Sequence, residues 1–331
     1  MLSIIKKHNT EQGIDYVNQL QYTNRRGKHK KSFFSLCPLC PLWQVFYMDI
    51  KTIGIIGAGR MGSGIAQVMA VSGFEVILTD VKDEFIERGI DNIKKGLVKA
   101  LEKGKITSEE KEKAITKIRT TTRLKDMAKV DFIVEAVSEI EELKLDIFKR
   151  LDEICRKEVI LSTNTSSIPI SKIASVTNRQ DKVIGMHFMN PAPVMELVEV
   201  VRGINTSDET FAIVKKLAEK IGKISVESKD SPGFIVNRVL MPMINEAVFA
   251  LMEGVATAED IDKAMTLGAN LPKGPLALAD LIGLDTVLSI MESIYKETKN
   301  PKHMPCPLLK RYVDEGHLGR KTGQGFYKYP K

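Results

Sequence analysis

The sequence predicts an α/β fold, in which a parallel sheet covered by helices is followed by an all-α carboxyl-terminal domain. From about Met48, short runs rich in Ile and Val alternate with amphipathic stretches of helical period, which is typical of a parallel sheet. The alternation ends near the segment SKDSPGF, and roughly a hundred residues of helical periodicity follow. The runs expected to be strands are residues 53–56, 74–78, 132–137, 159–162 and 183–187.

The domain organisation follows from this change of pattern. With 331 residues, of which 43% are hydrophobic, the chain is long enough for about two domains with full cores. Pro232 and Gly233 suit a boundary, so we expect a sheet domain over residues 48–230 and a helical domain over residues 231–331. Residues 1–47 are expected to be an extension outside the fold, because MDIKTIGIIG reads like a natural protein start. A true amino-terminal arm or targeting segment is the alternative.

Composition excludes several classes of partner. Residues 1–47 hold seven Lys or Arg against two acids, which is +5 of the net charge of +7, so the remainder carries only +2 and a nucleic-acid partner is not expected. The apolar part of the extension is interrupted by Pro38 and Pro41 and is too short to span a membrane. Four cysteines make no disulfide framework, which fits the cytoplasm. The pair Cys37 and Cys40 has no second pair at zinc-ligand spacing, so no metal site is expected.

The first chemical motif is the segment GAGRMG, in which Gly57, Gly59 and Gly62 fit the pattern GxGxxG. Alone this pattern is weak, but here a predicted strand precedes it and a predicted helix follows it, and a second strand finishes at Asp80. Gly57 would permit the tight turn, Gly59 would let the backbone approach a pyrophosphate, and Gly62 would let helix and strand pack closely. The segment therefore predicts a Rossmann-type dinucleotide-binding domain. A glycine-rich turn without a ligand is the weaker alternative.

Asp80 bears on which dinucleotide is bound. A carboxylate at the end of the second strand accepts hydrogen bonds from the ribose hydroxyls on the adenine side and repels a 2′-phosphate. NAD is therefore favoured over NADP, although Lys82 lies close by in the sequence. The alternative for Asp80 is a helix cap.

A cluster of small polar residues follows the expected strand VILST. Asn164, Thr165, Ser166 and Ser167 lie where the carboxyl end of a parallel strand meets the ligand crevice. One of these hydroxyls could hold a substrate oxygen beside the nicotinamide. The alternative is that Ser167 caps the helix expected over PISKIASV.

The segment GMHFMNPAPVMELVEV supplies a candidate base. Of the five histidines, His187 alone lies inside a run that reads as buried strand. A core histidine with one hydrogen bond is one interpretation, and a general base that takes a proton from an alcohol is the other. Glu199 follows twelve residues later on the returning strand ELVEVV and could fix the tautomer of the ring. Asn237, in the first helix beyond the expected boundary, could reach back with its amide.

Five motifs together resemble the (S)-3-hydroxyacyl-CoA dehydrogenase family, and within it the stand-alone bacterial enzymes. They are GAGRMGSGIAQ, STNTSS, HFMNPAPVMELVEV, DSPGFIVNR and GRKTGQGFYKY, in the same order and spacing as in the family. The resemblance runs from about Met48 to the end of the chain and does not cover residues 1–47.

The resemblance implies an NAD(H)-dependent oxidoreductase that interconverts 3-hydroxyacyl-CoA and 3-oxoacyl-CoA, with the short-chain pair acetoacetyl-CoA and 3-hydroxybutyryl-CoA expected first. His187 is then the catalytic base, Glu199 is its partner, and Ser166 and Asn237 hold the substrate. No metal is needed. The implied cofactor contacts are Gly57, Gly59, Met61, Gly62, Asp80, Glu139, Lys144, Asn190 and Lys321. On the residues alone, Glu139, Lys144 and Lys321 read as solvated surface charges.

The sequence says less about the binding of CoA. Lys95, Lys99 and Lys103 recur every four residues on one expected helix, so one helical face is basic and could meet the phosphates of CoA, with Lys103 as a substrate contact. For any single lysine a solvated face is the alternative. The helical domain is expected to close the acyl pocket and to pair with a second subunit, giving a homodimer or higher homo-oligomer, because it offers more apolar surface than it can bury alone.

Two rival classes remain open. Related dehydrogenases of small 3-hydroxy acids need a catalytic lysine near the start of the second domain, where SPGFIVNR offers Asn237. A non-catalytic NAD-binding protein could lose His187 or Glu199 without harm, and both are present.

Residues 1–47 generate a direct prediction. A chain that begins at Met48 is expected to fold, bind NADH and turn over acetoacetyl-CoA like the full chain, because the first expected strand begins only near Lys51. Thermal stability and steady-state rates of the two lengths check this. An insoluble shorter chain, or a melting temperature lower by more than about 5 °C, would show that the extension is part of the fold.

Overall fold

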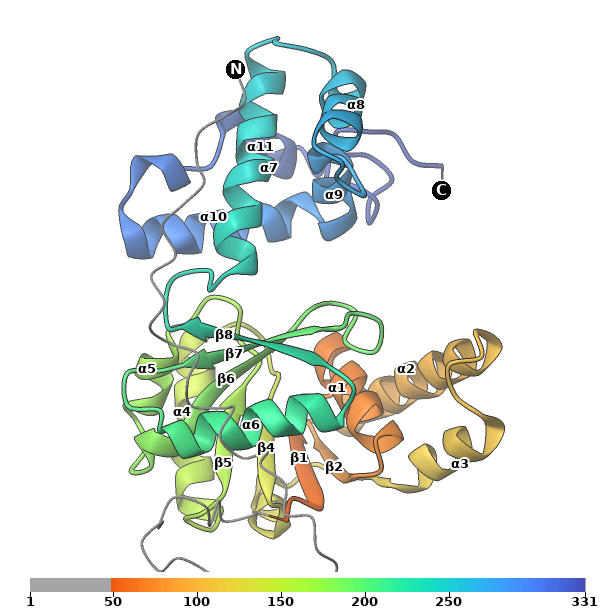
Figure 1. Cartoon of the computed structure of the whole chain (residues 1–331), viewed down its shortest axis with the longest axis vertical. Helices are drawn as coiled ribbons and strands as arrows, with labels where there is room; N and C mark the ends of the chain where they lie inside the picture. The colour runs from red at the N-terminus through yellow and green to blue at the C-terminus, as the bar shows by residue number, and fades with distance from the viewer. Residues whose placement is uncertain (1–48, 331) are drawn as a thin grey trace, which may run out of the picture. The chain divides into compact units, whose positions relative to one another are not determined.

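The sheet runs through the first part of the chain in a computed structural model that describes residues 49–330 (Figure 1). Within these residues it has eight strands in the order β3-β2-β1-β4-β5-β6-β7-β8. Their bounds are β1 Thr52–Ile56, β2 Glu75–Thr79, β3 Ile118–Thr121, β4 Phe132–Glu135, β5 Ile160–Thr163, β6 Val183–Phe188, β7 Leu197–Arg202 and β8 Ile224–Lys229.

The strand order reverses at the first strand. β1 pairs in parallel with both β2 and β4, and parallel pairing continues through β5 to β6. β7 then runs antiparallel to β6, and β8 lies parallel to β7. In open sheets of this kind, ligands bind outside the carboxyl ends of the strands where the order reverses. The fold therefore places a ligand crevice beyond the end of β1.

Helices lie between successive strands, as parallel pairing requires, except between the antiparallel neighbours β6 and β7. The α-helices of this part are α1 Arg60–Val71, α2 Asp83–Glu102, α3 Ser108–Thr116, α4 Glu141–Ile154, α5 Ile170–Ala174 and α6 Asp208–Lys220. Two short 3₁₀ helices are added, η1 Leu124–Lys129 and η2 Gln180–Lys182.

Among the described residues, the regular elements that follow the sheet are mainly helices, with isolated β-bridges near the end at Gln324. The helices are α7 Val236–Met252, α8 Ala258–Gly268, α9 Pro275–Ile282, α10 Leu284–Thr298, the 3₁₀ helix η3 Pro301–His303 and α11 Pro307–Asp314. They share an apolar core of their own, which includes Leu276, Leu284 and Met291. The predicted class, a Rossmann-type α/β domain followed by an all-α domain, is confirmed. No helix in residues 49–330 combines the length and the apolar character that crossing a membrane needs.

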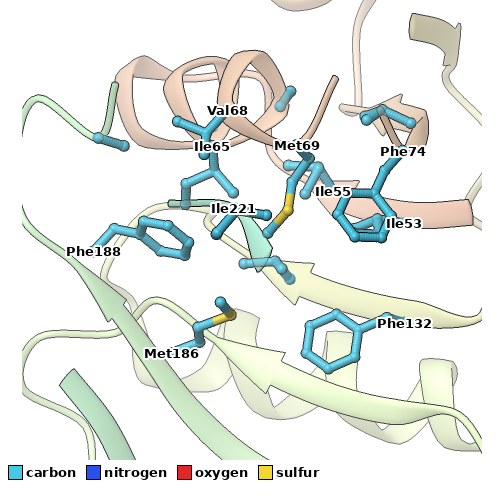
Figure 2. Packing of buried hydrophobic residues seen from close by; sticks show 14 of the residues in the cluster. Ile53, Ile55, Ile65, Val68, Met69, Phe74, Phe132, Met186, Phe188 and Ile221 are labelled. Atoms are coloured by element: carbon cyan, nitrogen blue, oxygen red, sulfur yellow. The ribbon is translucent and has the colours of Figure 1, made fainter. Parts of the chain in front are cut away.

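Alternate residues of the central strands point into different cores, as the period of a strand requires. In β4, Phe132 and Val134 belong to one apolar cluster and Ile133 to another. Figure 2 shows the first cluster, in which side chains of α1 pack beside those of β1. The second contains Phe148 of α4. Because both faces of the sheet are covered, its central strands are apolar on both sides and read as continuous runs.

All five apolar runs expected to be strands are strands, with ends that differ by one or two residues, and ELVEVV is the antiparallel return strand. Two strands were not expected, β3 and β8. Both lie at the edges of the sheet, and of their ten residues only one, in β8, is buried, so their sequences IRTT and ISVESK lack an apolar run. The expectations for residues 1–47, including Cys37 and Cys40, lie outside the described residues.

A buried arginine fastens the end of α4 to the loop that precedes β6. Arg179 is 7% exposed, and its Nε donates to Asp152 Oδ1 at 2.7 Å. Its other nitrogens donate to the main-chain oxygens of Asp152, Cys155, Arg156 and Val159. A buried charge is tolerated only when its hydrogen bonds are satisfied in this way.

Arg179→Met should lower the free energy of unfolding by about 3–5 kcal/mol, because it leaves the buried carboxylate of Asp152 without its cation. Denaturant unfolding measures the change. Arg156→Met is the matched control: Arg156 is half exposed and pairs with Asp131, so its loss should cost at most about 1 kcal/mol. Equal losses for the two variants would contradict the role given to Arg179.

Candidate active site

The glycine segment forms a tight turn from β1 into α1. Gly57 has φ of +99°, a conformation that favours glycine, and its N–H donates to Thr79 O at 2.8 Å. A Cβ on Gly62 would lie 1.8 Å from the carbonyl oxygen of Gly57, so only glycine allows the turn and the helix to pack this closely. No side chain caps α1 at Gly59. The first amides of this helix therefore lack a side-chain acceptor, which suits the pyrophosphate of a dinucleotide.

Asp80 ties the end of β2 to the glycine turn. Its Oδ2 accepts from Ala58 N and its Oδ1 from Val81 N, both at 2.7 Å. The alternative of a helix cap is wrong, because Lys82 is the N-cap residue of α2 and no side chain caps that helix. Each carboxylate oxygen keeps a lone pair for a further donor.

A hollow of about 540 Å³ opens beside this carboxylate. It extends from the glycine turn over the ends of β2 and β4 to α2 and α4. Its lining includes Gly57, Gly59, Asp80, Phe85, Arg88, Val137 and Arg150. The hollow lies at the reversal of strand order, so it has the position and the polar groups expected for the adenosine half of NAD.

Glu139 organises the polar turn after β5. Its Oε1 accepts from the hydroxyls of Thr165 and Ser167 at 2.5 and 2.8 Å and from the amides of Ser166 and Ser167 at 2.9 and 3.0 Å. Burial raises the pKa of this carboxyl group, but the charge of Lys144 and these hydrogen bonds outweigh it and lower the pKa. The hydroxyl of Ser166 has no hydrogen bond within residues 49–330, which leaves it available for a substrate oxygen.

Ser167 does not cap the following helix, so that alternative is wrong. The amides of Ile170 and Ser171, at the start of α5, donate instead to the carboxylate of Asp230 at 2.8 and 2.7 Å. Asp230 directly follows β8, an edge strand that the sequence pattern did not show, so nothing in the sequence indicated this cap.

Lys144 is a buried residue, which corrects the interpretation of it as a solvated surface charge. It is 1% exposed, and its Nζ lies 2.7 Å from Glu135 Oε1 and 3.4 Å from Glu139 Oε2. Glu135 is fully buried and also accepts from Thr163 Oγ1 and Val137 N. Glu135 was not among the expected site residues, although an acid at the end of the apolar run FIVE was a usable signal.

His187 and Glu199 are cross-strand partners on β6 and β7. The distance from Nδ1 to Oε2 is 2.7 Å, and the two residues are 7% and 0% exposed. Burial raises the pKa of Glu199, but hydrogen bonds from His187, Val236 and Ile235 and the charge of His187 lower it overall. An ionised carboxylate only accepts, so Nδ1 carries a proton, and in the neutral ring Nε2 is left as the acceptor. This is the state a general base needs.

Two asparagines flank the pair. Asn164 Oδ1 accepts from Phe188 N at 2.8 Å and so joins the polar turn to the strand that carries His187. Asn237 is the second residue of α7 and is 8% exposed. Its side-chain amide makes no hydrogen bond to another described residue. Hydrogen bonds therefore join the elements that carry Ser166, His187, Glu199 and Asn237, since Glu199 also accepts from the first amides of α7.

Three predicted residues have no such link. Asn190 precedes a cis peptide bond to Pro191, in the loop after β6. Lys321 pairs with Asp285 of α10 at 2.7 Å. Lys103 is the C-cap residue of α2. Within residues 49–330, none of the three has a hydrogen bond or ion pair to His187 or to the glycine turn. Met61 lies in the first turn of α1.

A second hollow, of about 450 Å³, lies where α1, α2 and the loop after β6 meet. Its lining includes Arg60, Gln67, Asn92, Lys95, Lys99, Pro191 and Pro193. Two of the three periodic lysines thus face one cavity with an arginine, and Lys103 is not in its lining.

Comparisons with known proteins agree with this geometry. Residues 52–231 match the NAD binding domain of 3-hydroxyacyl-CoA dehydrogenase, and residues 233–329 match its C-terminal domain. A probable 3-hydroxybutyryl-CoA dehydrogenase of Bacillus subtilis is 54% identical over 85% of this chain and 98% of its own length. A 3-hydroxybutyryl-CoA dehydrogenase of Bradyrhizobium diazoefficiens is 49% identical over 85% of this chain and 96% of its own.

Solved structures point the same way. The crystal structure of (S)-3-hydroxybutyryl-CoA dehydrogenase PaaH1 from Ralstonia eutropha has 48% identity and a TM-score of 0.82, and the match covers 85% of this chain and all of that one. Both family domains and these relatives span the sheet, the helices and the residues around His187. The chain therefore belongs to the 3-hydroxyacyl-CoA dehydrogenase family.

Proposed function

We propose that the chain interconverts (S)-3-hydroxyacyl-CoA and 3-oxoacyl-CoA with NAD(H), and that the short-chain pair 3-hydroxybutyryl-CoA and acetoacetyl-CoA is its substrate. The observation that carries the proposal is the buried His187–Glu199 pair, at 2.7 Å, near the carboxyl end of β6. The glycine turn follows β1, which runs in the same direction, so the base and the dinucleotide turn lie at one edge of the sheet. Family membership and the names of the relatives support the substrate.

The chain's own residues manage the proton. With Nδ1 held by Glu199, Nε2 of His187 takes the proton from the C3 hydroxyl of the substrate. Bound NAD⁺ would supply the acceptor for the hydride of C3, at C4 of its nicotinamide. In the opposite direction, the imidazolium returns the proton to the forming alkoxide, and the buried carboxylate stabilises the charged ring. The Ser166 hydroxyl and the Asn237 amide are proposed to hydrogen-bond the substrate oxygens and so fix the reacting geometry.

The proposed cofactor site begins at the glycine turn. Gly57, Gly59, Met61 and Gly62 would place the pyrophosphate at the amino end of α1, and Asp80 would take the ribose hydroxyls. Glu139 and Lys144 are proposed to serve this site together, since Lys144 is 1% exposed and lies 3.4 Å from the Glu139 carboxylate. Asn190 and Lys321 are proposed contacts because the family motifs assign them.

The CoA moiety is proposed to lie over the basic hollow of about 450 Å³. Arg60, Lys95 and Lys99 line it, and three cations in one cavity suit phosphate groups. Lys103, at the end of the same helix, is proposed as a further contact to the substrate.

The helical domain is proposed to pair with a second copy of the chain. Val239, Val255 and Leu267 are large apolar side chains there, and they are 67%, 71% and 75% exposed. Exposed apolar surface of this kind is typical of a protein interface.

We place the enzyme in the cytoplasm, where the buried thiols of Cys155 and Cys306 would stay reduced.

The decisive assay follows oxidation of NADH in the presence of acetoacetyl-CoA. His187→Gln keeps a hydrogen-bonding shape but removes the base, so turnover should fall by about 10²–10⁴-fold while NADH affinity changes little. Glu199→Gln should also lose activity, because the ring loses its anionic partner. A His187→Gln enzyme that retains more than about a tenth of wild-type turnover would refute the role of His187. If the wild-type chain is inactive on every 3-oxoacyl-CoA, the proposed function is wrong, and the alternative of a non-catalytic NAD-binding protein would stand.

Cofactor preference provides a second test. Asp80 lies at the hollow with both oxygens already fixed by amides, so it cannot turn away from a 2′-phosphate. We therefore expect higher kcat/KM with NADH than with NADPH, measured at saturating acetoacetyl-CoA. Asp80→Asn should reduce the ratio of kcat/KM with NADH to kcat/KM with NADPH, because it removes the negative charge. Equal or better kcat/KM of the wild type with NADPH would contradict this expectation. It would indicate Lys82 or Arg88 as the residue that binds the 2′-phosphate.

A further inference from the structure

Two successive residues between the sheet and α7 have left-handed backbone conformations. Gly233 has φ of +77° and Phe234 has φ of +48°. Such a conformation is ordinary for glycine but rare for a residue with a large side chain. It persists only where the surroundings impose it, and strained residues of this kind concentrate at functional sites.

The surroundings of Phe234 do impose it. Its side chain is 5% exposed and belongs to the apolar cluster that contains Ile168, Ile170 and Val201 of the sheet domain. Its N–H donates to Ser231 O at 2.9 Å, and Gly233 O accepts from Arg238 N at 3.0 Å. The ring is thus anchored in the sheet domain while the backbone leads directly into the first turn of α7.

This turn touches both members of the catalytic pair. The ring of Phe234 meets that of His187 edge-on, with centroids 5.6 Å apart. The next two amides, those of Ile235 and Val236, donate to Glu199 Oε1 at 2.9 Å each. Since the other oxygen of Glu199 is held by His187, the carboxylate is fixed at both ends. Glu199 is also the only charged group that the described residues bring into contact with the His187 ring.

We propose that Phe234 is a positioning residue for the reaction: its ring shields the His187–Glu199 pair from water, and its left-handed turn delivers the two amides that fix the carboxylate. The proposal rests on the proposed function, because it acts through the acid–base role of His187. A dry, fixed pair holds the imidazole in one orientation and strengthens its contact with the carboxylate. The competing interpretation is that Phe234 merely fills the core.

Phe234→Leu, compared with Phe148→Leu, separates the two interpretations. Phe148 is fully buried in the same apolar cluster, so both changes remove a ring from one core, but Phe148 makes no ring contact with His187. Both variants should lose thermal stability. Only Phe234→Leu should lose kcat, by about 10- to 100-fold, with little change in the KM for NADH. Phe234→Tyr, which keeps the ring, should retain most of the activity. Equal kcat values for the two leucine variants would overturn the proposal.

A double-mutant cycle tests whether Phe234 acts through the pair. In a Glu199→Gln background the carboxylate is already lost, so adding Phe234→Leu should lower kcat by no more than about twofold. If the two losses multiply, Phe234 acts independently of Glu199, and the positioning role is wrong.

Chemical modification gives a readout that needs no turnover. Diethyl pyrocarbonate acylates accessible imidazoles, and peptide mass spectrometry measures the rate at each histidine. Phe234→Leu should speed modification of His187 several-fold and leave His303, which is 1% exposed in η3 of the helical domain, unchanged. An unchanged rate at His187, or a parallel rise at His303 from general loosening, would overturn the shielding role. If the wild type lacks activity on 3-oxoacyl-CoA, the proposed function fails, and this measurement still decides whether the ring covers His187.

Discussion

The buried carboxylate of Glu199 is the constraint around which the rest of the site is arranged. A fully buried carboxylate is unfavourable unless donors surround it, and here it has three: the imidazole of His187 and the amides of Ile235 and Val236. The first donor requires β7 to return antiparallel to β6 in the correct register. The other two require the chain to leave the sheet through the turn at Gly233 and Phe234. One negative charge thus ties the topology of the sheet to the start of the helical domain.

A second charge system, centred on the buried Lys144, supports the polar turn after β5. Glu135 and Lys144 form an ion pair with side chains that are 0% and 1% exposed, and Lys144 also neutralises Glu139. Glu139 in turn holds the turn that carries Ser166. Removing Lys144 would leave the buried carboxylate of Glu135 without its cation and would take the neighbouring positive charge from Glu139. Backbone turns are usually held by local contacts, whereas this one is held by a carboxylate from 27 residues away along the chain.

The sequence was sufficient for the features that depend on local pattern. Central strands are apolar on both faces, so the runs at β1, β2, β4, β5 and β6 could be recognised, and Gly57 and Gly62 are imposed by backbone sterics that no other residue satisfies. Features that depend on contacts distant in sequence could not be predicted. The edge strands β3 and β8 lack an apolar pattern, and the cap that Asp230 gives α5 spans 60 residues. The burial of Lys144 and the left-handed turn at Phe234 arise only once the sheet is assembled.

The cross-strand pairing of His187 and Glu199 links chemistry to the accuracy of folding. Side chains alternate between the two faces of a strand, so a slip of β7 by a single residue against β6 would bring Val198 or Val200 opposite His187 and turn Glu199 into the apolar cluster on the other face. A misregistered sheet would therefore carry an uncompensated charge in its core and a histidine without its anion. Such a state is both unstable and inert, so the same glutamate that serves the reaction also discriminates against the wrong register. Selection for activity is, at this position, selection for correct strand alignment.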